Sequence, residues 1–298
     1  VTITQKTHGA GPVREAAGAA IFDSFEVSWP YTIELLKHTL TALDTGETED
    51  INDIAVLSDL VVGCQDCFPG YDPDEIIYLV GPVSAGLYST GIIYSTDAGS
   101  TWADIGGLPY DVDENVTQVE IGFMTDTQFR VIVANDANDI RYADVTLGAE
   151  GVPYVWSTAV EVGTVIEEMR WLFFDRLYVA ADGDIYVSSN QGDSFGSALY
   201  TGATQINAIE RSYDGETVWA VGEDNLILRE RNKSGAFDTM VGPSGGLNFY
   251  SIFEANDGRL YAGNGQSVYL STNGALNTGG WTELKDFGTN KTVVTVNC

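Results

Sequence analysis

The sequence predicts an all-β fold: a single β-propeller of about six four-stranded blades, with seven blades as the alternative. Two observations support this prediction. A strand followed by a turn and an aromatic residue recurs at roughly the length of one four-stranded blade. The segments between these copies are short alternating or buried apolar runs separated by turn residues, and none keeps a long helical period.

The clearest copy of the repeat is Ile92–Trp102, which reads IIYSTDAGSTW. A second copy is Ile185–Phe195, and a third, with an insertion, is Val268–Gly274 running on to Trp281. The positions taken as equivalent are Tyr94, Tyr142, Tyr186, Leu228 and Tyr269, and the steps between them are 48, 44, 42 and 41 residues. Steps of this size indicate one blade per repeat.

The repeats divide the whole chain, 1–298, into one propeller domain. The expected blade units are 1–49 together with 291–298, then 50–109, 110–162, 163–204, 205–246 and 247–290. Lys291–Val296 reads as the first strand of a further period, and Val1–Thr7, Ala19–Phe22 and Trp29–Leu36 read as the strands that this period lacks. We therefore expect the C-terminal strand to join the N-terminal blade, because ring closure removes open sheet edges.

The turn in the repeat has a recognisable pattern. The residues Ser95, Asp97, Gly99, Thr101 and Trp102 resemble the Asp-box, or BNR repeat, of sialidase-type β-propellers, and Ser188, Asn190, Gly192, Ser194 and Phe195 form a close variant. Ser271, Asn273 and Trp281 form a remnant. The resemblance implies a structural turn between the third and fourth strands of a blade, and it implies no particular activity. The chemistry agrees, since Asp or Asn accepts hydrogen bonds from its own turn and glycine allows positive φ.

The net charge of the chain argues against some classes of partner. It has 43 acidic and 14 basic residues, for a formal net charge of −29. Such a surface repels nucleic acid and anionic membranes, so neither is expected as a partner. No apolar stretch has the length of a membrane span, so no membrane insertion is expected. The acidity fits a marine or halophilic protein that tolerates high salt, and it equally fits an ordinary acidic secreted protein.

No catalytic set is visible, and we expect no enzyme activity. Sialidases resemble one another in an early Arg-Ile-Pro motif, and the only early arginine here is Arg14, which has no such context. The most suggestive carboxylate pair for a glycosidase-like hydrolase is Glu167–Glu168, at the start of a predicted inner strand. A solvated pair of charges is the more ordinary interpretation.

Metal and cofactor signals are weak. No cofactor is expected, although acidic turns provide oxygen ligands of the kind that calcium prefers. The candidate calcium ligands are Asp72, Asp74, Asp111, Asp113, Asp136 and Asp139, and their spacing matches no EF-hand loop. Cys64 and Cys67 form an isolated CxxC, which we interpret as two ordinary thiols or a local disulfide.

These observations lead to three functional hypotheses. The first is a non-enzymatic structural or attachment protein on a virion surface, part of a tail, turret or capsid, because similar Asp-box propellers occur in phage and archaeal virus particles. Its partners would be other virion proteins or host surface glycans, and it would act in a homo-oligomer or larger assembly, at the virion surface or extracellularly. The second is a secreted or periplasmic binding or assembly module. The third is a glycan-active hydrolase.

Overall fold

The computed structural model describes residues 52–56, 76–80, 91–96, 101–105 and 115–286, with gaps at 126, 147, 149–153, 174, 213–214, 256 and 277–279. These residues all belong to one compact unit, Thr48–Val296. Within these ranges the regular elements are β-strands and no α-helix occurs, which confirms the predicted all-β class. The same ranges contain no helix long and apolar enough to cross a membrane.

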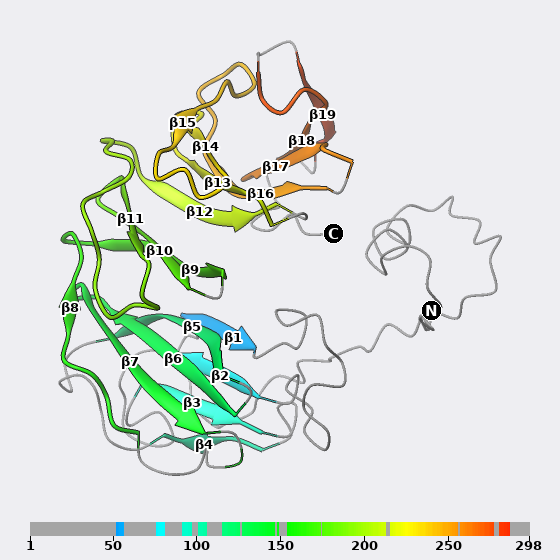
Figure 1. The fold of residues 1–298 in the computed structure, drawn as a ribbon. Helices are drawn as coiled ribbons and strands as arrows, with labels where there is room; N and C mark the ends of the chain where they lie inside the picture. Colours follow the sequence, from blue (N-terminus) through cyan, green and yellow to red (C-terminus); the bar gives the residue numbers. More distant parts are fainter. Residues whose placement is uncertain are drawn as a thin grey trace. The chain divides into compact units, whose positions relative to one another are not determined.

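The strands of the described residues form five antiparallel sheets, each built from consecutive strands (Figure 1). The first sheet contains β1 (Asp53–Val56), β2 (Ile77–Val80), β3 (Ile92–Ser95) and β4 (Ala103–Asp104). The second contains β5 (Val116–Thr125), β6 (Gln128–Asn135), β7 (Asp139–Thr146) and β8 (Val160–Glu161). Consecutive antiparallel pairing of this kind is the pattern expected of a propeller blade.

The remaining three sheets repeat this pattern. The third contains β9 (Ile166–Phe173), β10 (Arg176–Ala181) and β11 (Asp184–Ser188), and an isolated bridge from Ile185 to Tyr200 takes the place of a fourth strand. The fourth contains β12 (Ile206–Arg211), β13 (Thr217–Gly222), β14 (Ile227–Arg231) and β15 (Asp238–Thr239). The fifth contains β16 (Phe249–Glu254), β17 (Leu260–Asn264), β18 (Ser267–Ser271) and β19 (Trp281–Asp286).

Successive sheets meet through their first strands. Strand β1 contacts β5, β5 contacts β9, β9 contacts β12, and β12 contacts β16. Each sheet lies within one of the repeat units expected from the sequence, so we call the five sheets blades one to five. The expected sixth blade, 1–49 with 291–298, and the closure of the ring lie outside the described residues.

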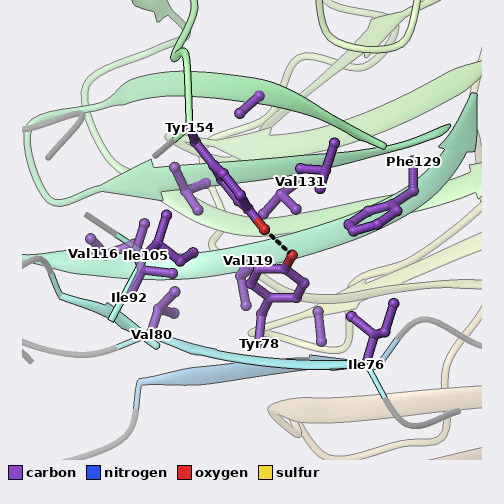
Figure 2. Packing of buried hydrophobic residues seen from close by; sticks show 14 of the residues in the cluster. Ile76, Tyr78, Val80, Ile92, Ile105, Val116, Val119, Phe129, Val131 and Tyr154 are labelled. Carbon is purple, nitrogen blue, oxygen red and sulfur yellow. Dashed lines mark hydrogen bonds between the residues drawn. The ribbon is translucent and has the colours of Figure 1, made fainter. Parts of the chain in front are cut away.

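The core consists of apolar clusters between successive blades. Between the first and second blades, Tyr78, Phe129 and Tyr154 are buried, and the hydroxyl groups of the two tyrosines form a hydrogen bond (Figure 2). Similar clusters fill the joints between blades two and three, three and four, and four and five. Full burial of one such large side chain contributes about 1.5–3 kcal/mol, so each joint is a substantial source of stability.

The second strand of a blade is buried on both faces. In β10, Leu177, Val179 and Ala181 pack toward the second blade, whereas Tyr178 and Ala180 pack toward the fourth. Because side chains alternate along a strand, a strand between two neighbours must be apolar at nearly every position. This explains the continuous apolar runs in the sequence that mark the middle of each blade.

Candidate functional site

The first strands of the blades carry the polar groups that deserve a functional interpretation. Four of them contain a β-bulge directly after the first residue, which leaves Thr117, Glu167, Asn207 and Tyr250 unpaired in β5, β9, β12 and β16. A bulge re-aims the side chain of the extra residue. The repetition of the bulge at the same place in four blades makes it a built feature of the fold.

Two of the bulged residues reach the next blade. The Glu167 carboxylate accepts hydrogen bonds from the backbone N–H groups of Ile206, at 2.9 Å, and Gly183, at 3.3 Å. The Asn207 amide donates to the Phe249 carbonyl oxygen at 2.8 Å. Burial raises the pKa of Glu167 although both backbone hydrogen bonds favour its charged form. Glu167 therefore connects the third blade to the fourth.

Glu168, the other member of the suggestive pair, lies in different surroundings. Its Oε1 is 2.9 Å from Nε of Arg170, an ion pair that is not aligned as a hydrogen bond. Arg170 also donates from Nη1 to Oε1 of Glu120 on β5, at 2.9 Å. The side chains of Glu120 and Glu168 are only 14% and 16% exposed, so the guanidinium between them joins two weakly solvated carboxylates from different blades.

Two further carboxylates complete what we call the inner-strand cluster, which consists of Asp53, Glu120, Glu168, Arg170 and Glu210. Asp53 on β1 accepts a hydrogen bond from the Val119 N–H at 3.0 Å, and its charge acts on both Glu120 and Glu168. Glu210 on β12 is close enough to Arg170 and Glu168 to interact electrostatically with both. The cluster thus holds four carboxylates and one guanidinium.

Burial and the excess of carboxylates over cations raise the pKa values of the glutamates in this cluster. Burial, together with the charge of Asp53, raises the pKa of Glu120 to about 7 against the pull of Arg170. Burial raises the pKa of Glu168 to about 8, and neighbouring carboxylates add to the effect. Burial also raises the pKa of Glu210. Burial alone would lower the pKa of Arg170, but Glu168 and Glu120 outweigh it and keep the guanidinium charged.

The cluster was not anticipated from the sequence, although a signal was present. Glu120, Arg170 and Glu210 each occupy the fifth position of a first strand, and Phe253 occupies that position in β16. A charged residue that recurs at one position of successive first strands indicates a shared environment.

In the third blade, the turn with the Asp-box resemblance follows β11, and the hydrogen bonds of Ser188 and Asn190 stay within the turn. The Ser188 hydroxyl accepts from the Gly192 N–H at 2.8 Å and donates to Oδ1 of Asn190 at 2.7 Å. Asn190 in turn accepts from the Ser194 N–H at 3.1 Å. Gly192 has φ +94°, and Phe195 packs on the apolar cluster shared with blade two. These side chains stabilise the turn.

The corresponding turn of the fifth blade shows the same bonds with one change. Ser271 Oγ accepts from the Ala275 N–H at 3.0 Å and donates to Oδ1 of Asn273 at 2.9 Å. Alanine thus stands where the other copy has glycine, with φ +60°. Trp281 Nε1 donates to the Val241 carbonyl oxygen at 2.7 Å, which connects this turn to the fourth blade.

Several residues of the predicted Asp-box, cysteine and calcium sites lie outside the described part of the chain. In the first copy of the turn, Ser95 is buried, Trp102 is half-buried and Thr101 is exposed, while Asp97 and Gly99 lie outside the described residues. Cys64, Cys67 and the calcium candidates Asp72, Asp74, Asp111 and Asp113 also lie outside them.

Two calcium candidates are described, and both have protein partners. Asp136 accepts hydrogen bonds from the backbone and side-chain nitrogens of Asn115, at 3.2 and 2.9 Å. Asp139 lies 3.7 Å from the Arg141 guanidinium. No group of three or more acidic, histidine or cysteine side chains in the described part of the chain is arranged to hold a metal ion.

Comparison with known proteins supports the fold. No protein-family model matches the chain, and no curated protein sequence matches it. Among solved structures, the chain is similar to YCF48 bound to a D1 peptide, with a TM-score of 0.53 and 16% identity over 80% of this chain and 69% of that one. Another similar structure is the extracellular domain of the putative one component system BT4673 from B. thetaiotaomicron, with a TM-score of 0.49 and 16% identity. That alignment covers 71% of this chain and 26% of the other.

At such low identity the likeness concerns the fold alone. Together with the consecutive antiparallel sheets, the similarity to YCF48 establishes that the chain has a β-propeller fold.

Proposed function

We propose that the chain is a non-enzymatic propeller module that binds or assembles with a protein partner. The observation that carries this proposal is that each joint between described blades is fixed by a side chain bonded to the backbone of the neighbouring blade. A rigid support of this kind is suited to presenting loops for recognition. The similarity to a propeller solved with a bound peptide agrees with a protein partner.

The joints show this construction in detail. From the first blade to the second, Asn52 Nδ2 donates to the Val116 carbonyl at 2.7 Å. From the second to the third, Gln118 Nε2 donates to the Glu167 carbonyl at 2.9 Å. The bonds of Glu167 and Asn207 described above extend the series to the fourth and fifth blades. Each of these hydrogen bonds is shielded in part from water and is costly to lose, so the joints resist opening.

The setting we propose for this module is the surface of a virion, as part of a tail, turret or capsid, in contact with other virion proteins or host glycans. The net charge of −29 supports an extracellular setting of high ionic strength, where repulsion between such surfaces is screened. A secreted or periplasmic assembly module would use the same scaffold and is the alternative.

Cross-linking of a tagged chain in its native particles or extracellular fraction, followed by mass spectrometry, tests the proposal. We expect cross-links to one defined protein partner, and these should involve residues of the loops between strands. Cross-links confined to the chain itself in every fraction would contradict a binding function. Recovery with secreted proteins and absence from particles would favour the alternative setting.

A second candidate function is glycoside hydrolysis, which one observation favours. Glu168 has a pKa raised to about 8, as expected of a general acid, and carboxylates from three other blades lie near it. A hydrolysis screen on a glycan panel should then detect activity in the native chain that Glu168→Gln removes. Absence of hydrolysis on the panel would discard this candidate.

A further inference from the structure

The inner-strand cluster connects four consecutive blades through charge. Each of the strands β1, β5, β9 and β12 supplies one carboxylate, from Asp53, Glu120, Glu168 and Glu210, and β9 also supplies Arg170. Among these groups the guanidinium is the only cation. If all four carboxylates were ionised, the cluster would carry three uncompensated negative charges, in addition to the acidity of the whole chain.

The contacts within the cluster cross between blades. The bond from Arg170 to Glu120, at 2.9 Å, joins the third blade to the second. The bond from the Val119 N–H to Asp53, at 3.0 Å, joins the second blade to the first. Because the two glutamates bonded or paired to Arg170 are largely withdrawn from water, solvent can screen their mutual repulsion only weakly. Repulsion within the cluster therefore acts directly on the joint between blades two and three.

We propose that the inner-strand cluster makes this joint sensitive to pH: bound protons hold blades two and three together, and the joint loosens as pH rises and the carboxylates ionise. This inference concerns the regulation of the scaffold and goes beyond the proposed binding function. Asp53, Glu120, Glu168, Arg170 and Glu210 are the charged groups that face one another from the four strands.

The pKa values of Glu120 and Glu168 set the pH range over which the joint loses stability. Their ordinary pKa is 4.5, and in the folded chain it rises to about 7 for Glu120 and about 8 for Glu168. Between these limits the folded chain holds protons that the unfolded chain has released. A raised pKa in the folded state therefore contributes stability that is complete below about pH 4.5 and is lost as pH rises through 7 and 8.

Thermal unfolding from pH 5 to pH 9 at fixed salt tests this inference. The variants are Glu120→Gln and Glu168→Gln, which keep a neutral group of similar shape, and the matched control is Glu161→Gln, an exposed residue at the end of β8. We expect the Tm of the native chain and of the control to fall by about 5 °C or more over this range, and the Tm of each variant to fall clearly less. Parallel curves for all four proteins would overturn the inference.

Two measurements on the native chain keep the test decisive if a variant fails to fold. A difference titration of the folded and urea-unfolded chain should show at least about one extra proton bound to the folded chain between pH 6 and 7. Hydrogen exchange, corrected for its intrinsic pH dependence, should show protection of β5 and β9 decreasing more with pH than protection of β16 and β17. Equal proton binding, or equal loss of protection in both pairs of strands, would contradict a switch at this joint.

Discussion

Replacing Arg130 with methionine tests whether one buried side chain stabilises the joint between blades two and three. The Arg130 side chain is 5% exposed and lies on β6 of the second blade. Its guanidinium donates two hydrogen bonds to Asp144, at 2.6 and 3.0 Å, and stacks on Tyr142, 3.6 Å from the ring centre. It also donates to Asp193 at 2.6 Å and to the Gln191 carbonyl at 2.9 Å, both in the third blade.

The expected cost follows from these contacts. Breaking a buried ion pair by removing one partner typically costs about 3–5 kcal/mol. Here Asp144 and Asp193 are 43% and 48% exposed, so water recovers part of the lost interaction. Methionine also preserves much of the packing of the arginine stem. We therefore expect a loss of roughly 2–4 kcal/mol, which in a chain of this size corresponds to a Tm lower by roughly 3–8 °C.

Thermal and urea unfolding of the two variants Arg130→Met and Arg259→Met provide the assay. Arg259 makes an equally short ion pair, 2.6 Å to Asp257, but both side chains are about half exposed and lie in one turn. An exposed pair contributes less than about 1 kcal/mol, so this control should unfold almost as the native chain does. If Arg130→Met lost no more stability than the control, burial of Arg130 at the joint would not be what makes its ion pairs with Asp144 and Asp193 strong.

Three further changes test the turns and the close approaches. Ser188→Ala should lower the free energy of unfolding by about 1–3 kcal/mol in urea titration, because the Gly192 N–H loses its acceptor; an unchanged midpoint would contradict this. Gly222→Ala should cost more than 3 kcal/mol, or prevent folding, since its Cβ would collide with the Gln205 carbonyl oxygen, and normal yield with an unchanged Tm would refute it. Trp219→Phe should lower the free energy of unfolding by about 1–3 kcal/mol, because Glu254 loses the indole N–H that donates to it at 2.5 Å; a loss no larger than that of the exposed-pair control Arg259→Met would refute this.

The fold could be predicted because its signals are local. Turn residues and an aromatic such as Trp281 repeat at blade spacing, and the second strands are apolar at successive positions because both faces are buried. In the fifth blade the aromatic of the repeat, Trp281, begins the fourth strand, whereas in the third blade Phe195 begins none and the structure has only the bridge from Ile185 to Tyr200. The two glycines in this stretch, Gly196 and Gly202, add little to a strand, because glycine has no side chain to pack.

The site was predicted less well because its contacts are not local. Glu167 and Glu168 are adjacent in sequence and were considered together, yet the bulge gives them different partners: the backbone of the fourth blade for Glu167, and Arg170 for Glu168. A bulge reverses the alternation that sequence patterns rely on. The role of Glu120 depends on an arginine fifty residues away, and no spacing rule within one blade connects them.

The joints also explain why the repeats are regular in length but degenerate in residue type. At the start of the second strands, Tyr78, Arg130, Tyr178 and Trp219 all face the following blade, and each bonds to a different group there: Tyr154, Asp193, Glu230 and Glu254. The fold requires a long side chain with a polar end at this position. The apolar part of the side chain covers the core, and the polar end needs a hydrogen-bond partner because it is withdrawn from water. Blade length fixes where the polar end lies, so each joint depends on the spacing of the repeat and on a matched pair of side chains. The chemistry of the pair differs from one joint to the next because both members differ together, so the joints keep one arrangement although the repeats differ in residue type.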